Sequence, residues 1–202
     1  MTPDAVNHHA GHPGFAGITG LLAGLTMIIG RDAVARLAAD LASVSDTDRV
    51  VDVGCGPGTA VREAARRGAR VTGVDPAPVM LGLARTLTRN RPAITWAEGT
   101  AEKLREPDGS ATVVWSLATV HHWTDVTAGL AEVRRVLSSG GQFLAIERCV
   151  RPGATGIASH GWTGHQAESF AAQCRAAGFD SVRAEKHTPR RRAVFVVRAV
   201  RP

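Results

Sequence analysis

Short apolar runs alternate with amphipathic stretches along most of the chain. The short runs are rich in Val and Ile, which is typical of strands. They predict strands at Arg49–Val53, Ala69–Val74, Ile94–Ala97, Ala111–Leu117, Gln142–Glu147, Ser181–Glu185 and Ala193–Val200. Ala111–Leu117 is apolar almost throughout, as expected for a parallel strand that is covered on both faces.

The amphipathic stretches predict helices between the strands. They are expected at Thr59–Arg67, from Pro78 to about Asn90, at Asp125–Leu137, and from the capping-box pair Thr163 and Gln166 to Gly178. Residues 15–43 are expected to be helical in two pieces divided near Gly30, whereas residues 1–13 are expected to be loose.

This alternation predicts an α/β fold: a single doubly wound, Rossmann-like domain around a mostly parallel seven-stranded sheet. His187–Arg192 is too short to hold a crossover helix, so the last strand should be antiparallel. We divide the chain into an N-terminal helical lid or extension at 1–47 and the sheet domain at 48–202.

Composition excludes several classes of protein. The 202 residues are 44% hydrophobic and 21% charged, an ordinary globular balance. No apolar run reaches the roughly 18 residues that span a bilayer. The segment before Phe15–Gly30 has no Lys or Arg, unlike a secretory signal. Cys55, Cys149 and Cys174 are far apart in the sequence and form no C-x-x-C pair, which favours reduced thiols in the cytoplasm.

Positive charge is spread over the chain. Lys and Arg exceed Asp and Glu by 24 − 18 = 6, but the arginines are dispersed and Tyr is absent. A solvated Arg-rich surface fits this pattern better than a nucleic-acid interface, so no nucleic-acid partner is expected.

The main candidate for chemistry is the loop after the first predicted strand. Gly54, Gly56 and Gly58 alternate with other residues, which allows a tight turn and a close approach of the backbone to a ligand. Asp75 ends the second predicted strand, where a carboxylate can accept hydrogen bonds from a ribose. Together they predict an adenosine-type cofactor, with an ordinary tight turn as the structural alternative. The spacing G-x-G-x-G differs from the dinucleotide fingerprint G-x-G-x-x-G, which disfavours a dehydrogenase.

Five motifs then carry a family resemblance. V-V-D-V-G-C-G-P-G-T, V-T-G-V-D-P-A-P-V-M, E-G-T-A-E-K-L, V-V-W-S-L-A-T-V-H-H-W and E-V-R-R-V-L-S-S-G-G occur in that order. The sequence from about residue 48 to 200 resembles the class I S-adenosylmethionine-dependent methyltransferases, in particular the small-molecule group called type 11. The resemblance implies S-adenosylmethionine as cofactor and S-adenosylhomocysteine as product.

The resemblance also assigns roles by position. The loop Gly54–Gly58 would contact the methionine part of the cofactor, Asp52 would order the loop or bind the amino group, and Asp75 would hold the ribose. Ala101 would meet adenine through its backbone N–H. The remaining residues of these motifs that it places beside the cofactor are Cys55, Pro76, Thr100, Glu102 and Leu117. Many relatives have Asp where this chain has Thr100.

The expected acceptor is a small molecule, partly apolar or anionic, methylated on O, N or C. His121 and His122 follow the fourth predicted strand and are candidate bases for a hydroxyl acceptor, and Trp123 could line its pocket. The alternative is that one histidine caps the next helix and Trp123 packs in the core. Arg190 and Arg191, with Arg192, could attract an anionic acceptor or form an exposed hairpin tip.

Other interpretations stay open. His8, His9 and His12 lack an adjacent acidic ligand and precede Pro13, so no metal site is expected there. The chain could bind the cofactor without turnover. A nucleic-acid methyltransferase is disfavoured, because the fourth strand is followed by neither an N/D-P-P-Y/F motif nor a Pro-Cys pair. Either a monomer or a homodimer fits the sequence.

Overall fold

The computed structural model describes residues 5–10, 32–89 and 91–202 of the chain. A seven-stranded sheet runs through these residues in the order β3-β2-β1-β4-β5-β7-β6. The strands are β1 (Arg49–Val53), β2 (Arg70–Asp75), β3 (Ile94–Glu98), β4 (Ala111–Leu117), β5 (Leu137–Arg148), β6 (Asp180–His187) and β7 (Val194–Val200). The pairs among β1 to β5 are parallel and β7 is antiparallel to both of its neighbours, which confirms the predicted fold class.

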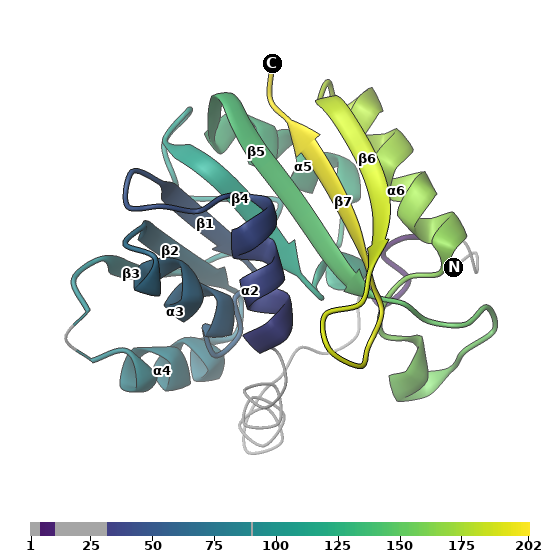
Figure 1. Cartoon of the computed structure of the whole chain (residues 1–202), viewed down its shortest axis with the longest axis horizontal. Coiled ribbons are helices and arrows are strands. Elements are labelled where there is room, and N and C mark those ends of the chain that lie inside the picture. The colour runs from purple at the N-terminus through teal and green to yellow at the C-terminus, as the bar shows by residue number, and fades with distance from the viewer. Residues whose placement is uncertain (1–4, 11–31, 90) are drawn as a thin grey trace.

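Helices cover both faces of the sheet (Figure 1). The α-helices are α2 (Asp32–Leu41), α3 (Thr59–Arg66), α4 (Pro78–Leu87), α5 (Val126–Val136) and α6 (Gly164–Ala176), and the short 3₁₀ helices are η1 (Val120–His122) and η2 (Gly156–Ser159). One buried cluster packs α2 and α3 against residues such as Val50 and Val71, and the other packs α5 and α6 against residues such as Val51 and Phe143. The alternation of side chains along each strand therefore supplies two cores.

Local sequence signals explain several element ends. Gly68 follows α3 with φ +96°, and Gly178 follows α6 with φ +82°, the left-handed conformation that ends many helices. Thr163 and Gln166 form the predicted capping box at the start of α6. Asp125 accepts a hydrogen bond from the backbone N–H of Ala128 and caps α5.

Three expectations need correction. α4 ends at Leu87 rather than near Asn90, because the Thr88 N–H donates to the carbonyl of Arg85, three residues back, and no longer follows the α-helical pattern. β5 begins at Leu137, well before the predicted Gln142. Residues 5–10 are not loose. The backbone carbonyl of Val6 accepts a hydrogen bond from the buried indole of Trp162.

The two helical pieces predicted within residues 15–43 fall only partly within the described residues. Asp32–Leu41 is the second of the two predicted helical pieces, and the first piece and His12 lie outside the described residues. Among the described residues, no helix combines the length and apolar character needed to cross a membrane.

Candidate functional site

The glycine loop lies between β1 and α3, at the carboxyl edge of the sheet. Gly54, Gly56 and Gly58 have φ values of +74°, +52° and +78°, a region that side chains rarely adopt. A Cβ atom at Gly58 would collide with the ring of Trp96, and one at Gly54 would lie 2.6 Å from the Thr119 side chain. At Gly56 a Cβ atom would meet nothing within 4 Å, so this peptide borders open space.

Asp75, at the end of β2, holds this loop in place by hydrogen bonding. Its Oδ2 atom accepts a hydrogen bond from the Gly56 N–H at 2.8 Å, and Oδ1 accepts one from the Ala77 N–H at 2.9 Å. Burial raises the pKa of the Asp75 carboxyl, and the two hydrogen bonds act in the opposite direction. The carboxylate therefore orders the loop. Because each oxygen has a further lone pair, the ribose contact stays a prediction that this geometry permits.

The other predicted residues of the first two motifs occupy different environments. Asp52 is buried in β1 and Cys55 is buried within the loop. Burial, followed by the charges of Asp52 and Asp75, raises the pKa of the Cys55 thiol well above its usual value, so the thiol is protonated at neutral pH. Pro76 is exposed at the end of β2, and Leu117 is half-buried at the end of β4.

The segment after β3 is the predicted adenine contact. Thr100 is exposed and pairs with Lys103 across a short bridge, while Ala101 is buried. The Oε1 atom of Glu102 accepts hydrogen bonds from the backbone N–H groups of Thr124 (2.7 Å) and Asp125 (3.1 Å). Glu102 thus connects this segment to the loop that precedes α5, and its adenine contact stays a prediction.

The two predicted bases lie in η1, directly after β4, and differ in environment. His121 is only 2% exposed, and its Nδ1 atom lies 2.8 Å from Oε2 of Glu147, which is fully buried in β5. His122 is half-buried. Burial and, after it, the nearby imidazoles of His121, His160 and His9 lower the pKa of His122 to about 3. His122 is therefore neutral at neutral pH and weakly basic.

The three predicted substrate residues are spread along the carboxyl edge. Trp123 is 5% exposed and packs edge-on against Phe170 in the core. Arg190 and Arg191 are exposed in the turn between β6 and β7. Because β6 is parallel to β5, this turn lies at the same edge as the glycine loop.

Three further residues shape the site and were not predicted from the sequence. Trp96 closes over Gly58, Glu147 pairs with His121, and His160 lies beside His121 and His122. Only Glu147 carries a usable signal, since it is a lone carboxylate at the end of the apolar run Phe143–Ile146. Trp96 and His160 reach the site through contacts between distant segments.

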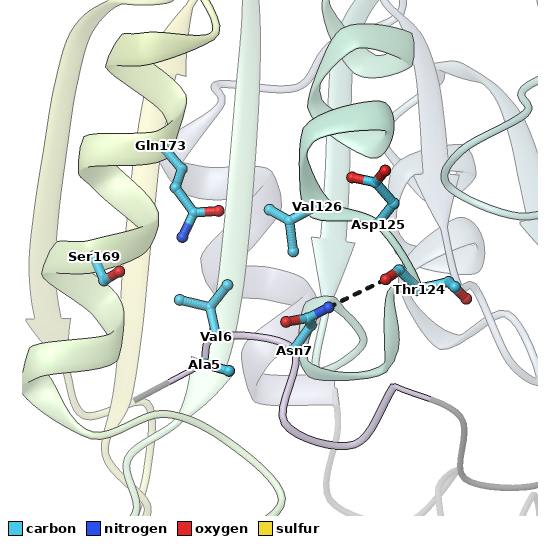
Figure 2. Close-up of a pocket in the computed structure, with 8 residues that line it drawn as sticks. All are labelled: Ala5, Val6, Asn7, Thr124, Asp125, Val126, Ser169 and Gln173. Atoms are coloured by element: carbon cyan, nitrogen blue, oxygen red, sulfur yellow. Dashed lines mark hydrogen bonds between the residues drawn. The ribbon is translucent and has the colours of Figure 1, made fainter. Parts of the chain in front are cut away.

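A cavity of about 450 Å³ lies beside this edge, between the N-terminal segment, α5 and α6 (Figure 2). Its lining includes Asn7, whose side-chain amide donates to the carbonyls of Trp123 (3.0 Å) and Thr124 (3.3 Å). A second cavity, of about 400 Å³, lies between α4 and β3. Neither cavity is lined by the glycine loop or Asp75.

Comparison with known proteins identifies the type of domain in which this arrangement occurs. Residues 51–145, which span β1 to the middle of β5, match the family model described as a methyltransferase domain. Residues 51–145 therefore carry a methyltransferase domain. The predicted family resemblance, to the type 11 group, is thereby confirmed.

Curated relatives share this domain. The methyltransferase domain is 33% identical over 112 residues to a demethylmenaquinone methyltransferase of Tropheryma whipplei, covering 55% of this chain and 46% of that protein. It is 32% identical over 112 residues to a ubiquinone biosynthesis O-methyltransferase of Agrobacterium fabrum, covering 54% and 45%. The chain thus spans about half the length of the curated relatives it matches.

A solved structure supports the fold of the methyltransferase domain. A methyltransferase of Aquifex aeolicus, described as dependent on S-adenosylmethionine, superposes with a TM-score of 0.77. The two chains are 14% identical, and the match covers 90% of this chain and 98% of the other. At this level of identity the match establishes the fold alone.

Proposed function

We propose that the chain is an S-adenosylmethionine-dependent methyltransferase that transfers a methyl group to an O, N or C atom of a small molecule. The observation that carries the proposal is the open space over Gly56, whose N–H is fixed by Asp75. This space lies beside the point where the strand order reverses between β1 and β4, which is where ligands bind in open α/β sheets.

The reaction needs positioning above all. An electron pair of the acceptor attacks the sulfonium methyl group, the carbon–sulfur bond breaks, and S-adenosylhomocysteine remains. Holding the two reactants in line supplies a large part of the rate enhancement. The role of the glycine loop is to hold the methionine part of the cofactor, and the roles of Asp75 and Ala101 are to hold its ribose and adenine.

A hydroxyl acceptor must also lose a proton. His121 is the better of the two candidate bases, because Glu147 orients its ring and leaves Nε2 as the atom that receives the proton. His122 is the weaker base because of its low pKa. The contact of residues 5–10 with this region supports a role for the N-terminal segment in covering the acceptor.

The names of two relatives support a small-molecule acceptor. They refer to demethylmenaquinone and to ubiquinone biosynthesis, and both names point to quinone-type compounds. We therefore propose phenol-like or quinol-like compounds as the first acceptors to test, with anionic variants because of Arg190 and Arg191.

A labelled-methyl assay tests the proposal. The protein is incubated with methyl-labelled S-adenosylmethionine and a panel of phenols, quinols, their carboxylated forms and RNA. We expect label in at least one small molecule and none in RNA. Thermal-shift measurements in parallel should show stabilisation by S-adenosylhomocysteine and none by NAD. Binding without transfer to any acceptor would favour a non-catalytic binding protein, and stabilisation by NAD alone would contradict the proposal.

A further inference from the structure

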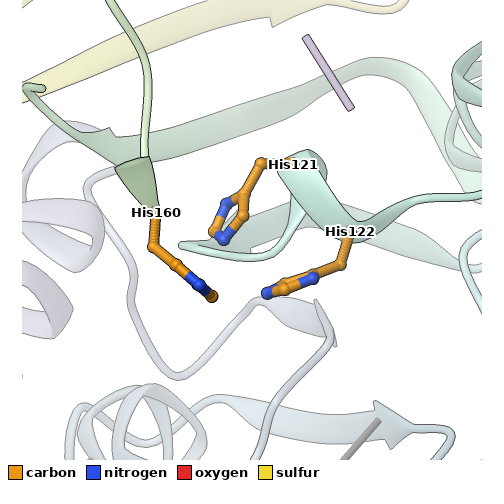
Figure 3. Close-up of side chains that lie close together, drawn as sticks. All are labelled: His121, His122 and His160. Carbon is orange, nitrogen blue, oxygen red and sulfur yellow. The ribbon is translucent and has the colours of Figure 1, made fainter. Parts of the chain in front are cut away.

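Three histidines from two separate segments meet at the carboxyl edge of the sheet. His121 and His122 belong to η1, and His160 follows η2. One ring nitrogen from each lies within 4.8 Å of those of the other two. The ring centroids of His121 and His122 are 4.1 Å apart, and the His160 ring is 5.4 Å from each. Figure 3 shows the three side chains pointing toward one another.

His121 has the environment of a metal ligand. Its Nδ1 atom is hydrogen-bonded to the buried carboxyl group of Glu147, which fixes the ring and leaves Nε2 with its lone pair. Nε2 is buried and has no hydrogen-bond partner among the described residues. A buried polar atom without a partner is costly. In proteins, an imidazole that binds a metal commonly donates its other ring N–H to a carboxylate in this way.

The other two imidazoles are also held in place. The His122 ring packs against the His9 ring, with centroids 5.7 Å apart. The carbonyl of His160 accepts a hydrogen bond from Nε of Arg148 at 3.0 Å. Gly161 follows with φ +139°, and a Cβ atom there would collide with the carbonyl of Arg148. These contacts with Arg148 hold the segment that carries His160 against the end of β5.

The N-terminal segment closes the cluster from one side. The His9 ring stacks on His160 with centroids 4.2 Å apart, and its Nε2 atom lies 3.0 Å from the Ser159 hydroxyl. The backbone N–H of His9 donates to the carbonyl of His121 at 2.9 Å. His9 thus packs around the cluster, and its Nε2 is already bonded to Ser159.

We propose that His121, His122 and His160 bind a divalent transition-metal ion of the Zn²⁺ class. Three neutral imidazoles suit Zn²⁺, Co²⁺ or Fe²⁺, whereas Mg²⁺ and Ca²⁺ prefer oxygen ligands. Three protein ligands leave a coordination position for water or substrate, as in catalytic zinc sites. The sequence did not predict this site, because His160 is separated from the other two by 38 residues or more.

The place of the proposed metal site in the fold indicates what the ion would do. This step of the inference rests on the proposed methyl transfer. Thr119 precedes His121 by two residues, and its hydroxyl donates to the carbonyl of Val53 beside Gly54. The metal site therefore adjoins the glycine loop. An acceptor oxygen bound to the ion would have a lowered pKa. In the metal-bound protein Nε2 of His121 is a ligand, and the ion takes the place of the histidine base.

Metal titration of the purified chain tests the site. The protein, carrying no histidine tag, is stripped with EDTA and titrated with Zn²⁺ by calorimetry and with Co²⁺ by visible absorption. We expect one equivalent to bind, with a Co²⁺ spectrum typical of four or five ligands. Glu147→Gln should weaken binding by about 10–100-fold. His122→Ala and His160→Ala should weaken it further, since each removes a direct ligand.

His187→Ala is the matched control, because His187 lies at the end of β6 outside the cluster. It should bind Zn²⁺ like the unaltered chain, and circular dichroism verifies that each variant is folded. Equal affinity in His160→Ala and His187→Ala, or no Zn²⁺ binding by the unaltered chain, would overturn the metal site. S-adenosylhomocysteine affinity is measured on the same metal-free protein. Its absence would contradict the proposed function and leave the metal result standing.

Discussion

Gly58 combines a left-handed backbone conformation with tight packing. Its φ of +78° is unfavourable for any side chain, and the Trp96 ring occupies the space that a Cβ atom would need. We predict that Gly58→Ala lowers the free energy of unfolding by about 2–4 kcal/mol, from the left-handed backbone and from overpacking. Urea denaturation measures this change.

The same substitution at Gly82 is the control for Gly58. Gly82 lies within α4, and a Cβ atom there would meet nothing within 4 Å. Gly82→Ala should raise the free energy of unfolding by about 0.5–1 kcal/mol through helix propensity. If the two variants were equally stable, the account of the packing around Gly58 would be wrong.

At the residue scale, the sequence predicted the site residues that belong to consecutive elements of the chain. The three glycines and Asp75 were recognised from the glycine spacing and from the position of the acid at the end of the next predicted strand, within one strand–loop–helix–strand unit. The pairing of His121 with Glu147 joins residues 26 apart in sequence. Such contacts depend on how β4 and β5 align, which side-chain types alone do not specify.

Helix α6 links the cluster region to the N-terminal segment. Thr163 caps its first turn, and the side-chain amide of Gln166 donates to the carbonyl of Ala5. We predict that Thr163→Ala lowers the free energy of unfolding by about 1 kcal/mol, because it removes the cap. The measurement is chemical denaturation followed by far-UV circular dichroism.

Thr155 provides the comparison for Thr163. It precedes η2, but its side chain makes no capping hydrogen bond. Thr155→Ala should change the stability by less than about 0.5 kcal/mol. A loss at Thr155 as large as that at Thr163 would show that the capping box is not the cause.

At the element scale, the sequence predicted β1 and β4 with their observed bounds, because β-branched runs and turn residues mark strands locally. The start of β5 was missed, since Ser138 and Gly140 lack strand character and lie in the irregular stretch between the pairs Ala111–Leu137 and Val113–Gln142. The order of residues 5–10 was also missed. It comes from packing against Trp162 and η1, which no periodicity in that segment indicates.

At the scale of the whole molecule, the turn that carries Arg190 and Arg191 lies at the same edge of the sheet as the glycine loop. We predict that Arg191→Glu raises KM for an anionic acceptor several-fold at low salt, because it reverses a charge at that edge, and that high salt weakens the effect. Steady-state kinetics at two ionic strengths measure it.

Arg70→Glu makes the same change in net charge at the opposite edge, where β2 begins. Both arginines are exposed, so neither variant should lose much stability. Equal KM values in the two variants would mean that net charge, rather than the position of the turn, governs the acceptor. An effect confined to Arg191→Glu supports the proposed anionic acceptor.

Calorimetric titration with S-adenosylhomocysteine tests the central claim most directly, in the unaltered chain and in Gly56→Ala and Gly140→Ala. Both glycines have positive φ and open space at the Cβ position, but Gly140 lies near the start of β5, at the edge away from the loop. Each variant should lose about 1–2 kcal/mol of stability. The account predicts binding to the unaltered chain and Gly140→Ala, with affinity reduced about tenfold or more in Gly56→Ala, where the methyl group meets the ligand. No binding to the unaltered chain, or equal affinity in the two variants, would contradict it.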